Sequence, residues 1–104
     1  MIEYFEPVLP GEKNVLTFNM APGLLNGNTL TGTPTITVTT YSGTDPDPSA
    51  ILNGAAQIDS TNTKVLVPFY AQVDHTQYLV KASCATEQST ISLETQGILP
   101  VSST

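Results

Sequence analysis

The side chains that could do chemistry in this sequence are few. His75 is the only histidine, so a nucleophile and base pair would have to combine it with a serine, a threonine or Cys84. It lies in "VDHTQ", where Asp, His and Thr fit a hairpin turn for local conformational reasons. We therefore expect His75 to be a solvated turn residue, with catalytic use as the alternative.

The only cysteine, Cys84, is in phase with Tyr78 and Val80 in the alternating stretch "QYLVKASCA". That phase predicts a buried and inert thiol, because a reactive thiolate would need basic neighbours that are absent from its face. A single cysteine also excludes an internal disulfide and a metal site built from several cysteines.

Two carboxylates, Asp45 and Asp47, occur in "TDPDPS" at a spacing seen in calcium loops. Pro46 and Pro48 stand where an EF-hand loop would not place them, and the glycine and further oxygen ligands of such a loop are missing. We interpret this stretch as an acidic solvated loop, with a weak surface cation site as the alternative. The sequence also contains no phosphate-binding glycine loop, HExxH or GxSxG motif, so we expect neither an enzyme nor a cofactor.

The composition of the chain excludes some classes of binding partner. The chain has 104 residues, which is one domain by size, and a formal charge of −6 without any arginine. Nucleic acids and anionic lipids require clustered cationic side chains, so we expect neither as a partner. The N-terminal "MIEYFEPVLPGEK" has acids where a secretion signal would have lysines, and no stretch is long enough to span a membrane. We expect a protein that folds in a reducing cytoplasm.

Apolar side chains alternate with polar ones along most of the chain, as in "TPTITVTTY", which predicts strands with one buried face. Strands are expected at 13–20, 29–32, 33–41, 55–59, 64–71, 77–85 and 89–101, with a turn at Gly32 and one helical turn before Asn53. Pro68 predicts that its strand is an edge strand or bulged. The predicted core consists of Leu16, Phe18, Ile36, Val38, Val65, Val67, Tyr78, Val80, Ile91 and Leu93.

Short strands at regular spacing, with no helix long enough for a crossover, predict an all-β fold with a sandwich or small barrel. Tyr78 opens a strand four residues after Asp74, as does the tyrosine that anchors the corner between two strands in immunoglobulin-type sandwiches. A tyrosine that only fills core space is the alternative. Val80 stands where an antibody domain has a cysteine, and the chain lacks tryptophan, which excludes a true antibody-type domain.

Three stretches resemble the small immunoglobulin-like virion proteins of tailed bacteriophages: "PGEKNVLTFNMAPGLLNGNTLTGTPTITVTT", "AAQIDSTNTKVLVPF" and "QYLVKASCATEQSTISLE". The resemblance covers most of residues 7–101 and rests on turns and alternations rather than on catalytic residues. His75-Thr76-Gln77 departs from it, since a glycine usually precedes the tyrosine. It implies a single antiparallel immunoglobulin-like β-sandwich over residues 13–101, with a polar tail at 102–104.

The resemblance further implies a multi-copy structural protein of the virion, assembled in the host cytoplasm. We expect it to decorate or cement the capsid by binding the major capsid protein. A neck, tail, baseplate or fibre component is an alternative, and so is a module that binds a host-surface carbohydrate.

Residues 1–12 form either an N-terminal arm or a first strand. "IEYFEPV" carries Tyr4, Phe5 and Val8 in a segment that the domain does not obviously need, while Pro7 and Pro10 leave few donors for a regular ladder. Such a segment is either docked on its own domain or buried in a partner as an added strand. For the second case we expect Tyr4, Phe5 and Val8 to contact the partner, helped by Asp45 and Asp47 or by the tail after Leu99.

Overall fold

The computed structural model describes the backbone of residues 2–102 and the side chains of residues 4–102. Strands dominate this part of the chain, and its two 3₁₀ helices are single turns. The elements are β1 (Ile2–Tyr4), β2 (Lys13–Asn19), η1 (Ala21–Gly23), β3 (Leu30–Ser42), η2 (Pro48–Ile51), β4 (Gln57–Ile58), β5 (Lys64–Tyr70), β6 (Thr76–Thr86) and β7 (Ser92–Val101). Within the described residues, no helix is long and apolar enough to cross a membrane. The predicted all-β class is confirmed.

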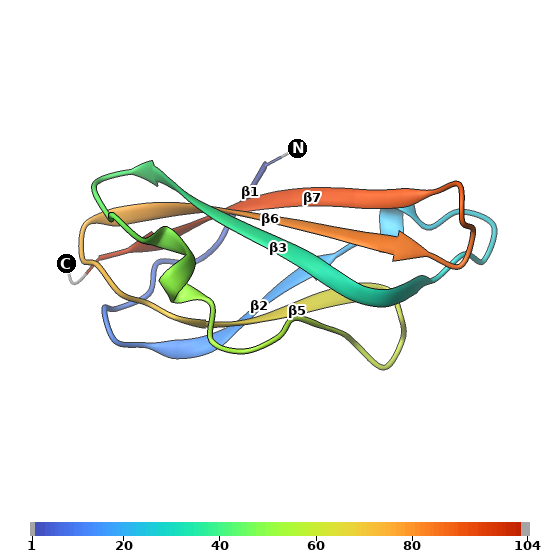
Figure 1. Ribbon diagram of the computed structural model, residues 1–104, viewed down its shortest axis with the longest axis horizontal. Helices are drawn as coiled ribbons and strands as arrows, with labels where there is room; N and C mark the ends of the chain where they lie inside the picture. Colours follow the sequence, from blue (N-terminus) through green and yellow to red (C-terminus); the bar gives the residue numbers. More distant parts are fainter. Residues whose placement is uncertain (1, 103–104) are drawn as a thin grey trace.

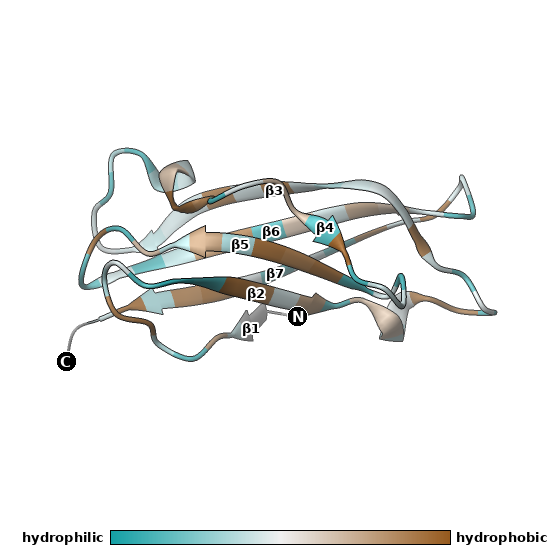
Figure 2. Ribbon diagram, turned by 90° about the horizontal axis from the view of Figure 1, so that it is seen from below, coloured by the Kyte–Doolittle hydropathy of each residue, from teal (hydrophilic) through white to brown (hydrophobic). Residues whose placement is uncertain are grey.

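The strands form two layers (Figure 1). One is a four-stranded sheet in the order β1-β7-β6-β3, and the other is a three-stranded sheet in the order β2-β5-β4. Neighbouring strands are antiparallel except for β1, which pairs with β7 in parallel. Hydrophobic segments of β2 and β5 lie over the other sheet in Figure 2.

The core lies between the two sheets, where the inward side chains of each strand meet. Seven of the ten predicted core residues are buried there: Leu16, Phe18, Val38, Val65, Val67, Tyr78 and Val80. Ile36 and Leu93 are half-buried and pack against this core. The prediction for Ile91 is wrong, because it precedes β7 in a turn where its N–H bonds the Gln88 carbonyl, and its side chain is 38% exposed.

The predicted break at Gly32 is a bulge instead of a turn. Gly32 has a φ of +78°, and the register of β3 with β6 shifts between Thr31 and Thr35. A bulge bends a strand without ending it, and a glycine accepts the positive φ at little cost. The two strands expected at 29–32 and 33–41 are therefore one strand.

Pro68 lies in the central strand of the three-stranded sheet, so the prediction of an edge strand is wrong for β5 as a whole. The register of β2 with β5 is also unbroken, with Val15 opposite Pro68, so there is no bulge. The Pro68 carbonyl accepts the Asn53 N–H at 3.0 Å, on the side away from β2. Backbone N and C=O of one strand residue point the same way, and β4 pairs only with Val65 and Leu66. The missing N–H of Pro68 therefore falls where β4 has ended.

Candidate functional site

The outer face of the four-stranded sheet begins with the threonines of β3. Thr35, Thr37 and Thr39 are exposed, while Ile36 is half-buried and Val38 is buried between the sheets. This is the alternation expected of a strand whose two faces meet core and solvent. The hydroxyl face of β3 therefore belongs to the protein surface.

A row of four side chains crosses this outer face. Tyr4 of β1 is opposite Ile98 of β7, Ile98 is opposite Leu79 of β6, and Leu79 is opposite Thr39 of β3. Opposed residues on neighbouring strands point to the same face of a sheet. Ile98 is nevertheless 0% exposed, although it is outside the core cluster between the sheets. Something on the outer face must cover it.

Tyr41 of β3 is a further exposed tyrosine near this row. It lies two residues beyond Thr39 and is 52% exposed, and Tyr4 is 64% exposed. The pKa of Tyr4 is raised, first by the electrostatic effect of the neighbouring Tyr41 and then by burial and by a hydrogen bond between the two side chains. Tyr4 and Tyr41 are thus electrostatic neighbours, and we call these two residues the tyrosine pair.

The segment before β2 is docked on its own domain. Phe5 N–H bonds the Ile98 carbonyl at 2.9 Å, and Val8 N–H bonds the Pro100 carbonyl at 3.0 Å. The Phe5 ring stands edge-on to the Phe18 ring, with 5.3 Å between centroids and an interplanar angle of 86°. Val8 is buried in the core. Phe5, which is half-buried, and Val8 therefore face inward, and Tyr4 is the exposed side chain of the three.

Gly97 explains how the Phe5 ring fits between the sheets. A Cβ at this position would overlap the Phe5 ring and approach Phe18 Cε1 to 3.2 Å. Only a residue without a side chain lets the first strand lie so close to β7.

Asp45 is held by hydrogen bonds within the chain. The Tyr78 hydroxyl donates to Asp45 Oδ2 at 2.6 Å and accepts the Val73 N–H at 3.4 Å, and the Asp47 N–H donates to Asp45 Oδ1 at 2.9 Å. Burial, followed by the bond to Asp45, raises the pKa of Tyr78. Tyr78 thereby ties the 43–47 loop and the β5–β6 turn to the core. Asp47 is exposed and accepts the Ser49 hydroxyl at 3.0 Å.

The remaining reactive groups lie apart from these features. His75 is in the β5–β6 turn with a φ of +58°, its side chain is 69% exposed, and its Nε2 is 3.6 Å from Asp74 Oδ2. Cys84 is buried, as predicted, with its Sγ 3.5 Å from the Thr31 carbonyl oxygen. Burial raises the pKa of the Cys84 thiol, which keeps it protonated and unreactive at neutral pH.

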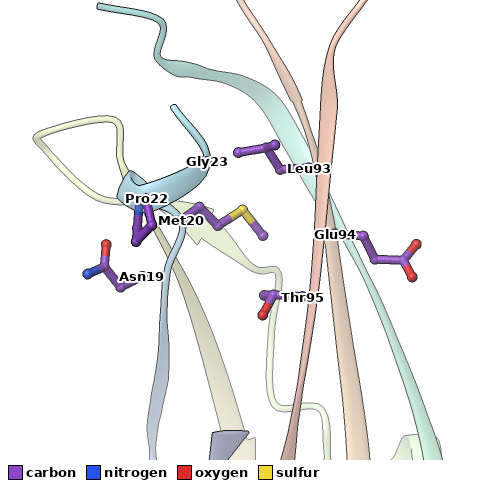
Figure 3. A pocket seen from close by; sticks show the side chains of 7 residues that line it. All are labelled: Asn19, Met20, Pro22, Gly23, Leu93, Glu94 and Thr95. Carbon is purple, nitrogen blue, oxygen red and sulfur yellow. The ribbon is translucent and has the colours of Figure 1, made fainter. Parts of the chain in front are cut away.

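One open pocket of about 170 Å³ lies between the end of β2 and the start of β7 (Figure 3). It is lined by Asn19, Met20, Pro22, Gly23, Leu93, Glu94 and Thr95. Met20 and Leu93 point into it, and the carboxylate of Glu94 points away. Among the described side chains, residues 4–102, no three of His, Cys, Asp or Glu gather as a metal site would require. The pocket offers apolar contact rather than acid–base or metal chemistry.

Tyr41 is the residue of the tyrosine pair that sequence reasoning missed. Its signal was present, because Tyr41 ends "TPTITVTTY" in phase with the outward threonines. An aromatic in the outward phase of a strand is unusual enough to mark a surface, but alternation does not say what lies opposite it. The comparisons with protein-family models, with curated proteins and with solved structures found no match.

Proposed function

We propose that this chain is a non-enzymatic structural protein of a bacteriophage virion, present in many copies and binding the major capsid protein as a decoration or cement. Its sandwich is, in this proposal, immunoglobulin-like. The support comes from the sequence resemblance together with the order of the strands.

The strand order is the observation that carries the proposal. Immunoglobulin sandwiches place their second, fifth and fourth strands in one sheet and their third, sixth and seventh in the other. Here β2-β5-β4 form one sheet and β7-β6-β3 the other, with β1 added beside β7. Because the resemblance to immunoglobulin-like virion proteins requires this arrangement, the strand order supports it. A fold alone does not specify a function, so the virion role rests on the two arguments jointly.

The edge of β3 is where a partner strand would add in this proposal. Phe5 N–H bonds the Ile98 carbonyl, so the backbone of Ile98 points toward β1, and that of Leu79, opposite it, points toward β3. Thr39 pairs with Leu79, which turns the backbone groups of Val38 toward the free edge. Unpaired edge groups of this kind can pair with an extended segment of another protein.

Quantitative mass spectrometry tests the assignment on particles of the phage whose genome encodes the chain. A copy number that follows the major capsid protein supports capsid decoration. A copy number that matches the neck or tail rings moves the protein there. Its absence from purified particles, when it is abundant in the lysate, overturns the virion role.

A further inference from the structure

We propose that Asn53 is a modification site, at which the folded chain converts to aspartate and isoaspartate without an enzyme. This reaction belongs to the loop between η2 and β4 and is independent of the virion role. The chain contains an internal comparison, because Leu-Asn-Gly occurs twice, at 25–27 and at 52–54. Two asparagines with the same neighbours have nearly the same intrinsic reactivity, so the fold decides which of them reacts.

The reaction begins at the backbone nitrogen of the residue after the asparagine. The Gly54 nitrogen gives its proton to hydroxide and attacks Asn53 Cγ, and the side-chain nitrogen takes a proton from water and leaves as ammonia. The product is a succinimide ring. Water opens the ring at Cγ to give aspartate, or at the main-chain carbonyl to give isoaspartate, whose main chain runs through Cβ and Cγ. A following glycine favours ring closure because it has no side chain to obstruct the attack.

Burial does not separate the two sites. Asn26, Gly27, Asn53 and Gly54 are all exposed. Within the described part of the chain, no hydrogen bond holds the side-chain amide of either asparagine or the N–H of either glycine. The difference between the sites is therefore one of backbone conformation.

The turn at Asn26 keeps the attacking nitrogen away from the side chain. Asn26 has a φ of +59° and Gly27 a φ of +76°. The Asn28 N–H bonds the Leu25 carbonyl at 3.1 Å, so these residues form a type I′ turn. The ψ of Asn26 in such a turn is about +30°, which places the Gly27 nitrogen nearly opposite Cβ across the Cα–C bond. Ring closure requires that nitrogen on the same side as Cβ, so the turn must open first.

A second contact holds this turn closed. The side chain of Asn28 is buried, and its Oδ1 accepts the Thr29 N–H at 3.0 Å and the Gln88 N–H at 3.4 Å. Opening the turn strains these bonds as well as the bond that closes it. The fold therefore protects Asn26.

Asn53 has no such turn around it. Its φ is negative, and neither the β nor the right-handed helical region puts the next nitrogen directly opposite Cβ. The Asn53 N–H bonds the Pro68 carbonyl at 3.0 Å, but rotation about the following Cα–C bond leaves that contact in place. In the described structure, no backbone hydrogen bond holds residues 54–56, and a Cβ added at Gly54 would meet nothing within 4 Å. The Gly54 nitrogen can therefore turn toward Asn53 Cγ.

The product should stay folded. The reaction changes only atoms beyond the Asn53 Cα, so the bond to the Pro68 carbonyl and the bridge between Leu52 and Phe69 are retained. Each event adds one negative charge, and isoaspartate also adds one carbon to the main chain ahead of β4. Modified copies are thus expected to accumulate as folded protein.

The test is incubation of the folded full chain at mildly alkaline pH, followed by mass-spectrometric peptide mapping. A protease that cleaves before aspartate separates the two sites, because Asp45 and Asp47 lie between them. The exchange of NH2 for OH changes the peptide mass, and an isoaspartyl methyltransferase labels the isoaspartate. We expect Asn53 to react about tenfold faster than Asn26, the factor that corresponds to breaking roughly one hydrogen bond to open the turn.

The chain unfolded in guanidinium chloride is the matched control, in which the two sites should react at nearly equal rates. Asn53→Gln should abolish the mass change at residue 53, because a larger ring closes far more slowly. Asn28→Ala should speed the reaction at Asn26, and circular dichroism should show that both variants are folded. Equal rates at the two sites of the folded wild type, or a faster reaction at Asn26, overturn the proposal. So does a folded chain in which Asn53 stays unmodified while the unfolded chain reacts.

Discussion

The bond between Tyr78 and Asp45 gives the sharpest test of how this domain is held together. Tyr78→Phe removes only the hydroxyl, so the buried ring keeps its packing in the core. The change removes the weak 3.4 Å bond from the Val73 N–H and the 2.6 Å bond to Asp45. The second has a carboxylate acceptor, a class that contributes about 1.5–3 kcal/mol to stability. Asp45 is half-buried and partly screened by solvent, so we expect a loss near the lower end, about 1.5 kcal/mol.

Urea and thermal unfolding, followed by far-ultraviolet circular dichroism, measure this loss. For a domain of this size, about 1.5 kcal/mol corresponds to a fall in Tm of about 6–12 °C. Tyr70→Phe is the control, because that hydroxyl belongs to an exposed side chain. The Asp45→Ala variant and the double variant complete a cycle, in which a coupling of about 1 kcal/mol is expected for contacting residues. A Tyr78→Phe variant within about 0.5 kcal/mol of the wild type would refute the reasoning.

The pH dependence of the same variant gives an independent check. Burial and the bond to Asp45 raise the pKa of Tyr78 in the folded state above the value of about 10 in the unfolded chain. The folded state then holds this proton more tightly, so its contribution is fully present below about pH 10 and is lost as the pH rises further. Wild-type stability should fall more steeply above pH 10 than that of Tyr78→Phe. If the unfolding free energies of the two proteins fall equally with rising pH, the raised pKa of Tyr78 is contradicted.

Four further changes test the fold and the sites. Val67→Asp should prevent folding, since an unpaired charge in the core costs several kcal/mol. Circular dichroism should then show no cooperative unfolding transition. Gly97→Ala should displace the Phe5 ring and lower the unfolding free energy by about 1–3 kcal/mol in urea titrations. Deletion of residues 1–6 should lower Tm markedly. Under the proposed virion role, an unchanged Tm with lost incorporation into particles would instead show an arm that binds a partner. His75→Gly should keep or slightly raise the unfolding free energy, because residue 75 has a positive φ. Under the proposed virion role, unaltered particle assembly would show that the imidazole is dispensable.

Much of the fold could be read from local patterns because a strand repeats its environment every second residue. Leu16 and Phe18, like Val65 and Val67, are buried because each pair occupies one phase of an alternating stretch. The burial of Cys84 was predicted by the same rule. The prediction that Ile91 is in the core was wrong because alternation does not reveal where a strand begins. Ile91 lies one residue before β7, in a turn.

The candidate site depended on contacts between distant parts of the chain. The sequence grouped Tyr4 with Phe5 and Val8 as possible partner contacts, but nothing local indicates that β1 pairs with β7 or that β3 lies at the opposite edge of the same sheet. The parallel register sets Tyr4 over Ile98, and this pairing turns an outward isoleucine into a buried support. In the same way, the hydrogen bond from Tyr78 to Asp45 joins residues far apart in sequence, and it exists only because the fold brings the 43–47 loop to Tyr78.

Each strand's own sequence thus determined which of its faces is apolar, since that property repeats along one short segment and needs no partner. The tertiary structure decided which strands are neighbours, because pairing is set by packing and hydrogen bonds between segments far apart in the chain. Tyr4 and Tyr41 are separated in sequence by all of β2 and most of β3, and they become electrostatic neighbours only through that pairing. A surface built from two edges of one sheet therefore becomes visible only when the sheet is assembled.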